Sequence, residues 1–449
     1  MENQSLPFGF HWRSKPSFVI STVALGLFTD LFLYGIIVPV LPFLLRERLD
    51  IPNDQIQVHI SALLAAYAGT SVVFSFPVGW IADKIGSRRL PFLAGLVLLL
   101  VATLMLAFSH KLAFLVIARS LQGVSASIVW TAGLAMVQDA VGPKGTGQAL
   151  GTISSVISVG ELLAPVVGGL LYHRAGISAI TAVSMGLLGI DLVMRLLVID
   201  AKMIPKNNDA QVNDCSSENG NLSAADSPRE PQPQEGDPLL RKPKPSNEEY
   251  KIRKNPTPME FAVPILYCFR NRRFVTAMIL VTIQSLLIGA FDATVPEETK
   301  SLFHFSSLQV GLVFIAIVVP NLVLGPVAGM AVDKYGTKVV ATAGYLFLVP
   351  CLLLLGLPSQ RILAGTENII LFCAVLALNG AGMSIIASPG LVEATHITEK
   401  YEAANPDFFG QNGPYAQLYG FSSLCAFAGL ACNDDVAGRH FLGNSHGLV

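Results

Sequence analysis

Long apolar stretches alternate with short polar segments along the whole chain. A membrane-spanning helix needs roughly 20 predominantly apolar residues, and eleven stretches of the sequence meet that requirement. The pattern therefore predicts an all-α polytopic membrane protein. The predicted spans cover residues 17–45, 58–82, 90–108, 112–138, 147–172, 177–199, 273–296, 307–332, 338–357, 368–393 and 413–432.

The polar segments divide these spans into two bundles. Residues 207–250 are rich in Asn, Ser, Asp, Glu and Pro and contain almost no aromatic residues, so this part of the central linker is expected to be disordered. The predicted division is a cytoplasmic N-terminus (1–16), a six-helix bundle (17–199), a cytoplasmic linker (200–272), a second bundle of five spans (273–432) and an atypical polar tail (433–449).

Composition supports this class and excludes several others. Hydrophobic residues make up 52% of the chain and charged residues only 14%, against roughly 25% charged residues in soluble domains. A net charge of −1 argues against a nucleic-acid partner. The six cysteines show no paired spacing, which indicates neither a disulfide framework nor a metal site. No phosphate loop or nucleophile elbow is present, so we expect neither an enzyme nor a bound cofactor.

Lysine and arginine are unevenly distributed between alternate loops. If the N-terminus is cytoplasmic, the inner loops and the linker hold most of the cations, as the positive-inside rule requires. We therefore expect the N-terminus and the linker on the cytoplasmic side of the plasma membrane or of a vacuolar membrane.

One polar motif occurs twice. Residues 79–89 read G-W-I-A-D-K-I-G-S-R-R, and residues 329–338 read G-M-A-V-D-K-Y-G-T-K. In both copies a glycine near the end of an apolar stretch is followed four residues later by an acid, and then by a turn with glycine and cations. The repeat predicts a duplicated bundle in which each copy forms a short cytoplasmic hairpin between two membrane helices. We treat these hairpins as candidate gating loops. Their candidate residues are Gly79, Asp83, Gly86, Arg88 and Arg89 in the first copy, and Gly329, Asp333, Gly336 and Lys338 in the second.

Besides Asp191, four acidic residues fall within predicted spans: Asp30, Glu161, Asp292 and Glu393. An acid in a bilayer helix costs about 2.5–3.5 kcal/mol on insertion scales. One interpretation is a polar cavity between the bundles, where burial disfavours the charged carboxylate and lets it take up and release a proton. The other is a position at a span end, in headgroup water. The first is favoured for Asp30 and Glu161, and both stay open for Asp292 and Glu393.

The sequence resembles the major facilitator superfamily over nearly its whole length. The first hairpin matches the loop motif of that family. Arg119, Gln122 and Gly123 resemble a motif of proton-coupled members, and G-E-L-L-A-P-V-V-G-G at 160–169 resembles the Gly-Pro motif of drug:proton antiporters, with Ala164 in place of a glycine. The resemblance implies a fold of two six-helix pseudo-repeats. Here the sequence predicts eleven spans, with the last helix missing.

Within that superfamily the chain is similar to vesicular amine transporters and their microbial multidrug relatives. The similar segments are Asp30 with V-P-V-L-P at 38–42, Asp191, F-D-A-T-V-P at 291–296 and G-L-V-E at 390–393. Tyr419 occupies the place of the acid expected in the eleventh span. The identity of the cargo is therefore not carried over from the amine carriers.

The resemblance also implies contacts for individual residues. Arg119 is expected beside Asp30, either as a pair that breaks during proton movement or as a static ion pair. Asp83 is expected at the N-terminus of the eleventh span, near Asn412 and Gly413. These hairpin contacts would form in the outward-facing state and break when the inside opens.

Three further features concern ion pairs and helix packing. The resemblance implies that Arg88 reaches Asp139 at the inner end of the fourth span. Asp191 and Arg195 are four residues apart on one helix and are expected to neutralise each other. The small residues of the fifth span either seal a leak path or simply pack a kinked helix, and they are Gly160, Pro165, Gly168 and Gly169.

These observations predict a monomeric, proton-coupled multidrug-efflux antiporter of the bilayer. It would export a small cationic or amphipathic organic molecule and use the proton gradient as its driving force. The alternatives are a facilitator or proton symporter for metabolite uptake, and a truncated member of the family that does not transport.

Overall fold

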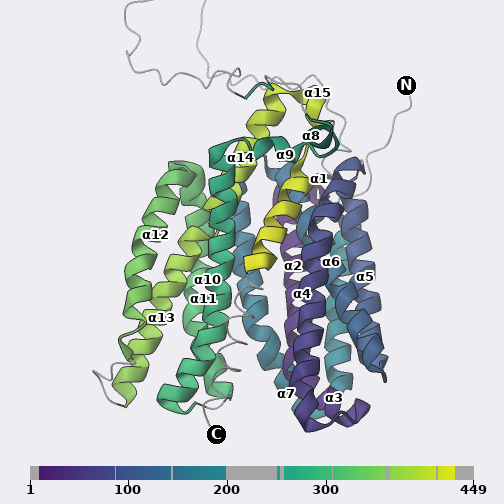
Figure 1. Cartoon of the computed structure of the whole chain (residues 1–449), viewed down its shortest axis with the longest axis vertical. Helices are drawn as coiled ribbons and strands as arrows, with labels where there is room; N and C mark the ends of the chain where they lie inside the picture. Colours follow the sequence, from purple (N-terminus) through teal and green to yellow (C-terminus); the bar gives the residue numbers. More distant parts are fainter. Residues whose placement is uncertain are drawn as a thin grey trace, which may run out of the picture.

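The described part of the chain is helical throughout, and it contains no strand. It is a computed structural model in which two helical bundles stand side by side (Figure 1). The structure describes residues 10–85, 87–142, 145–198, 250–252, 257–305, 307–358, 365–410 and 413–429. Three predicted features lie outside these ranges: Gly86, the polar tail and the disordered linker, except for Tyr250 at its end.

The N-terminal half consists of spans that follow the apolar stretches closely. A proline stands in the first turn of α2, η1 and α3, where its missing N–H is tolerated, so these three elements form one nearly continuous span. The elements are α1 (Phe10–Arg13), α2 (Pro16–Ile37), η1 (Val38–Val40), α3 (Leu41–Leu49), α4 (Asn53–Lys84), α5 (Arg89–Phe108), α6 (Leu112–Val141) and α7 (Thr146–Leu197).

The longest element, α7, is two spans joined without a loop. It has 52 residues, or roughly 78 Å at 1.5 Å per residue, against a bilayer core of about 30 Å. Gly176 breaks it with φ 66° and ψ −160°, a conformation that favours glycine. The two spans predicted on either side of this glycine are therefore confirmed. Pro165 lies inside α7, but the non-helical backbone angles are at Gly176 and not at the proline.

The C-terminal half begins with two short helices that lie across the end of the bundle (Figure 1). Thr257 caps α8, and its backbone N–H donates to Glu260, which lowers the pKa of that carboxyl group. The elements are α8 (Pro258–Ala262), α9 (Ile265–Cys268), α10 (Arg272–Phe303), α11 (Ser307–Tyr335), α12 (Thr337–Leu354), α13 (Thr366–Ile386), α14 (Pro389–Ala404), α15 (Pro406–Phe409) and a helix over 415–429, here called the 415–429 helix.

Nine of the described helical segments are long and apolar enough to cross a membrane. In that number α7 counts once, although it contains two predicted spans. The 415–429 helix is not counted, because the structure describes only part of its predicted span. Each of the eleven predicted spans therefore has a helix in the structure.

The two halves meet mainly along α7 and α11, and along α4 and the 415–429 helix. We call the end of the molecule that carries the α4–α5 and α11–α12 turns the hairpin side, and the opposite end the far side. The hairpin side is the upper end in Figure 1.

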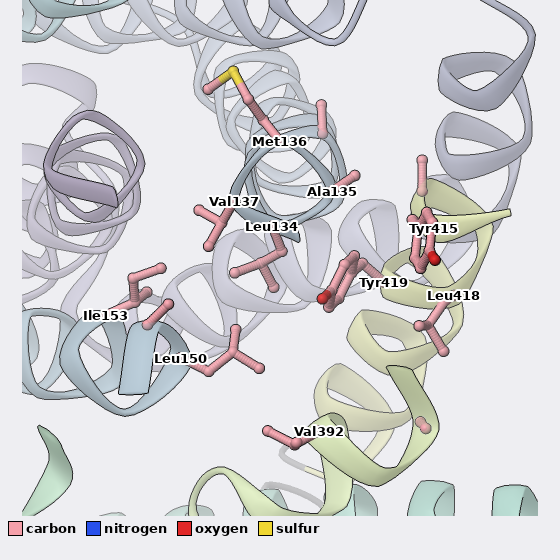
Figure 2. Close-up of a cluster of buried hydrophobic side chains, with 14 of the residues drawn as sticks. Leu134, Ala135, Met136, Val137, Leu150, Ile153, Val392, Tyr415, Leu418 and Tyr419 are labelled. Atoms are coloured by element: carbon pink, nitrogen blue, oxygen red, sulfur yellow. The ribbon is translucent and has the colours of Figure 1, made fainter. Parts of the chain in front are cut away.

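A hydrophobic plug joins the halves on the hairpin side (Figure 2). Leu134 of α6 and Leu150 of α7 belong to the N-terminal half, and Val392 of α14 and Tyr419 of the 415–429 helix belong to the other. All four side chains are at most 4% exposed. Burying an aliphatic side chain contributes roughly 1.5–3 kcal/mol, so separating the halves at this end has a substantial cost.

Within the N-terminal half, the small residues of the Gly-Pro stretch bring α7 close to α2. A Cβ atom on Gly168 would overlap the backbone carbonyl of Ile36, and one on Gly160 would lie 3.0 Å from the ring of Phe28. Gly169 faces open space. The structure therefore shows a packing role for Gly160 and Gly168.

Gly168 and Gly169 are adjacent in α7 and provide a direct test of the packing. We expect Gly168→Ala to destabilise the protein by about 1–3 kcal/mol, because the added methyl group overpacks the α2–α7 contact. Gly169→Ala is the matched control and should be neutral or slightly stabilising, because alanine is the better helix former. Thermal unfolding in detergent measures both, and equal midpoints for the two variants would contradict the assigned contact.

Candidate functional site

The acid of the first hairpin, Asp83, binds the other half of the molecule. Its two carboxylate oxygens accept hydrogen bonds from the backbone N–H groups of Ala416, at 3.0 Å, and Gln417, at 2.8 Å. These are among the first N–H groups of the 415–429 helix, which have no partner within the helix and carry its positive dipole end. The contact expected between Asp83 and the start of the eleventh span is present.

The acid of the second hairpin, Asp333, makes the equivalent contact from the C-terminal half to the N-terminal half. Its oxygens accept from the backbone N–H groups of Gly147 and Gln148, both at 2.9 Å, at the N-terminus of α7. The sequence analysis did not assign this partner, although the duplicated motif was the signal for it. Each half thus binds a helix N-terminus of the other half through one carboxylate. We call the two contacts the crossed carboxylate contacts.

The contact of Asp83 is supported by Arg88. Its guanidinium group donates to Asp83 at 2.6 Å and to Asp139 at 3.2 Å, and the side chain is only 1% exposed. The contact expected between Arg88 and Asp139 is therefore present. Arg89 instead donates to the backbone carbonyl of Leu196 at the end of α7.

Glycines of both hairpin motifs allow the close approach. A Cβ atom on Gly79 would overlap the carbonyl oxygen of Ala416, and one on Gly329 would overlap that of Gly147. Gly336 has φ 88° in the α11–α12 turn, a conformation that L side chains rarely adopt. Lys338, in the first turn of α12, is exposed.

The open question about Glu393 is answered by a break in its helix. α13 ends at Ile386 and α14 begins at Pro389, and Glu393 accepts a hydrogen bond from Thr337 at the start of α12. It therefore lies on the hairpin side, beside the second hairpin, which favours the interpretation of a position at a span end. Glu393 stands as many residues after the start of α13 as Asp139 does after the start of α6, so the two acids occupy equivalent places in the halves.

An asparagine that the sequence analysis missed bridges the halves further along α7 and α11. The backbone carbonyl of Asn321 accepts from Ser155 at 2.9 Å, its amide nitrogen donates to Ser158 at 2.5 Å, and its amide oxygen accepts from Ser384 at 2.8 Å. The only signal in the sequence was an amide within an apolar stretch, a residue type that joins membrane helices.

A second group of polar residues is buried inside the N-terminal half. Arg119 is fully buried and donates to Gln122 at 2.9 Å on the same helix, α6. Its guanidinium carbon lies 5.0 Å from the ring centre of Tyr34 and 6.0 Å from that of Tyr67. We call Asp30, Tyr34, Tyr67, Arg119 and Gln122 the polar cluster.

The ion pair expected between Arg119 and Asp30 is not formed. Both carboxylate oxygens of Asp30 and the Nε and Nη2 atoms of Arg119 are buried without a hydrogen-bond partner. The reason is that Arg119 is held by Gln122 and by the two tyrosine rings. The charged groups that act most strongly on Asp30 are instead Arg195 and Asp191.

The expected pair of Asp191 and Arg195 is present. Their side chains are fully buried and 2.7 Å apart, and Arg195 also donates to the carbonyl oxygen of Phe92 on α5. A Cβ atom on Gly26 would lie 2.7 Å from Arg195, so the pair packs against α2 one turn before Asp30. Two opposite charges lie together here and neutralise each other locally.

Glu161 and Asp292 form a third group, between the halves. Glu161 belongs to α7 and Asp292 to α10, and both side chains are exposed. The two carboxylates are close enough to repel each other, and Glu161 also acts on the hydroxyl of Tyr67. Tyr67 therefore lies within electrostatic reach of both Asp30 and Glu161. Its own hydroxyl is buried without a partner.

The polar groups of this region are carboxylates and hydroxyls, which exchange protons but, among the residues that the structure describes, do not form a metal site. Within the described ranges, no group of three or more His, Cys, Asp or Glu side chains is placed to hold a metal ion. Tyr34 and Tyr67 were missed in the sequence analysis. For Tyr34 the available signal was its spacing of four residues from Asp30, which places both on one face of α2.

Comparison with known proteins assigns the chain to a class. The family model described as Major Facilitator Superfamily matches residues 23–296 and 274–404. An MFS-type transporter named ppzB from Metarhizium rileyi is 54% identical over 431 residues, covering 95% of this chain and 89% of the relative. An uncharacterized MFS-type transporter of Schizosaccharomyces pombe is 37% identical, covering 95% of this chain and 90% of the relative.

More distant similarities are narrower or concern the fold alone. A probable vesicular acetylcholine transporter of Danio rerio is 32% identical over 166 residues, which is 36% of this chain and 34% of the relative. The crystal structure of the human organic anion transporter MFSD10 (TETRAN) superimposes with a TM-score of 0.60 at 17% identity, covering 92% of each chain.

The crossed carboxylate contacts generate a prediction about the hairpin side. Asp333→Asn removes the charge that binds the N-terminus of α7, and we expect a loss of about 1–2 kcal/mol from the closed arrangement. The buried plug should then open more often. A cysteine introduced at Leu150, which is 4% exposed, should react with a water-soluble maleimide roughly 5–30 times faster in the Asp333→Asn background.

Asp407→Asn is the control, because Asp407 is an exposed carboxylate on α15. It should leave the reactivity of the cysteine unchanged. Equal reactivity in the Asp333→Asn and Asp407→Asn backgrounds would show that Asp333 does not hold the halves together.

Proposed function

Because the chain belongs to the major facilitator superfamily, we propose that it is a secondary transporter that exports a small organic molecule from the cytosol in exchange for protons. The observation that carries this proposal is the unpartnered carboxylate of Asp30, buried in the N-terminal half within electrostatic reach of Tyr67. A buried carboxylate without a hydrogen-bond partner is costly in its charged form. It therefore gains from taking up a proton or from the arrival of a cation.

The crossed carboxylate contacts supply the alternation that such exchange needs. With both contacts formed, the hairpin side is closed, which corresponds to an outward-facing or occluded state if that side is cytoplasmic. When the halves separate there, Asp83 and Asp333 lose their partners on the opposite half. Arg88 retains Asp139 and Asp83 within its own half, so Asp83 keeps a counter-charge when the halves separate.

The proposed cargo is cationic or amphipathic. Glu161 and Asp292 expose two carboxylates from opposite halves, and their mutual repulsion is relieved when a cation or a proton lies between them. The relatives named as acetylcholine transporters match only about a third of this chain, so the cargo is proposed from these two acids and not from that name.

The remaining elements of the proposal concern placement. The protein would act as a monomer in the plasma membrane or a vacuolar membrane, with its N-terminus and linker in the cytosol. The driving force would be the proton gradient, with no cofactor. Cations on the hairpin side support this orientation, among them Arg13, Lys84 and Lys334.

Asp30→Asn separates proton coupling from cargo binding. In proteoliposomes that carry a pH gradient, we expect the variant to move ethidium at least about tenfold more slowly than the wild type. Exchange of ethidium for ethidium needs no proton, and it should persist. Asp50→Asn is the control, because Asp50 is exposed with φ 51°, a conformation that asparagine tolerates.

Neutral and anionic dyes tested in the same vesicles examine the proposed cargo class. Gradient-driven transport by Asp30→Asn at the wild-type rate would remove Asp30 from the mechanism. Wild-type transport that does not respond to the gradient would contradict exchange with protons.

A further inference from the structure

A small pocket lies inside the N-terminal half, among α2, α5, α6 and the second span of α7. Its volume is about 20 Å³, and a water molecule needs at least about 10–15 Å³ by the same kind of measure. Most of its lining is aliphatic, but four polar side chains also line it: Thr103, Gln122, Thr181 and Ser184. Roomy and partly polar, this pocket can hold water.

The pocket leads inward from the far side. Thr181 and Ile177 follow the Gly176 break and are half-buried, whereas Gln122 and Ser184 are at most 2% exposed. The half-buried residues therefore mark the outer end of the pocket, and Gln122 marks the inner end.

Gln122 also belongs to the polar cluster. The amide oxygen of Gln122 accepts from Arg119, whose Nε and Nη2 atoms have no partner. The hydroxyl of Tyr67 and both carboxylate oxygens of Asp30 are likewise buried and unpartnered. An unsatisfied buried polar group costs about 1–3 kcal/mol, and buried water is the usual way in which proteins satisfy such groups. The unpartnered atoms thus lie on the inner side of a pocket that can supply water.

We propose that this pocket is a water-binding site through which protons reach Asp30 from the far side, separately from the path of the cargo between the halves. The proposal rests on the proposed function and specifies the route of its proton. The Asp30 carboxylate takes a proton from water held by Tyr67 and Gln122. That water is reprotonated through the pocket from the bulk, so that one proton enters and no hydroxide remains.

The charges around the route are balanced when Asp30 is ionised. The charged groups that act most strongly on Asp30 on α2 are Arg195 and Asp191 on α7, which neutralise each other. Arg119 on α6 carries the charge opposite to that of Asp30. Tyr34 and Tyr67 add neutral hydroxyl groups from α2 and α4. On α5 the only titratable side chain is Arg89, at its first residue on the hairpin side. An arriving proton therefore meets no net positive charge.

A separate route has a mechanistic consequence. Tyr67 is within electrostatic reach of both Asp30 and Glu161, so a proton delivered from the pocket changes the field at the acids between the halves. The cargo can then be displaced by a proton that never shared its path.

Filling the pocket tests the route. Ser184→Leu places an isobutyl group where the water would lie, and Ser178→Leu is the control, because Ser178 is exposed on the same span. With ethidium in proteoliposomes, we expect Ser184→Leu to slow gradient-driven transport about tenfold while ethidium–ethidium exchange stays near that of Ser178→Leu. If driven transport and exchange fall together, or if neither falls, the separate route is overturned.

A second variant blocks the pocket after folding. Thr181→Cys is treated with a trimethylammonium-bearing methanethiosulfonate, and Ala182→Cys, whose exposed side chain does not line the pocket, is the control. We expect the first thiol to react and gradient-driven transport alone to slow. A thiol at 181 that does not react, or that reacts without effect, overturns the proposal. If ethidium transport by the wild type does not respond to the pH gradient, the proposed function itself is contradicted. The reactivity of the thiol at position 181 still reports whether water enters the pocket.

Discussion

The binding of a carboxylate to a helix N-terminus across the two halves is the interaction on which the rest of the structure depends. It occurs twice, from Asp83 to the 415–429 helix and from Asp333 to α7. Both contacts require small residues nearby, because only glycine lets the backbones approach so closely at Gly79 and Gly329. The duplicated hairpin motif is thus a requirement of packing as well as of charge.

The energies of these contacts suit a protein that must open and close. A hydrogen bond to a charged group contributes about 1.5–3 kcal/mol, and four of them cross the interface. Burial of Leu134, Leu150, Val392 and Tyr419 in the plug adds several kcal/mol more. Two states interconvert readily only when they differ by a few kcal/mol. In the proposed mechanism, contacts formed on the far side, together with protons or cargo at the acids, therefore have to offset most of this cost.

Much of this architecture could be predicted from the sequence. Apolar stretches located the helices, including the two spans on either side of Gly176, although their fusion into α7 was not predicted. The contacts of Asp83 and Arg88 were implied by the resemblance to the superfamily. The contact of Asp333 was not predicted, although a duplicated bundle places the second hairpin against the opposite half in the same way as the first.

Other features could not be predicted, for physical reasons. Spacing along α13 and α14 does not reveal that the helix breaks after Ile386, and this break places Glu393 beside Thr337. Likewise, the sequence indicates that Arg119 needs a partner but not which one. Gln122 and two tyrosine rings fill that role and leave Asp30 unpaired. Choices among several nearby partners are made by side-chain packing, which a one-dimensional pattern does not contain.

In the proposed mechanism, the hairpin side closes and opens through the crossed carboxylate contacts while the far side does the reverse. Distances between spin labels test it most directly, with one pair at Gln148 and Tyr335 and another at Asp50 and His304, all exposed positions. Across a range of pH, with and without ethidium, the account predicts two distance populations for each pair, and the pairs should change in opposite directions. A single unchanging distance for both pairs would contradict it.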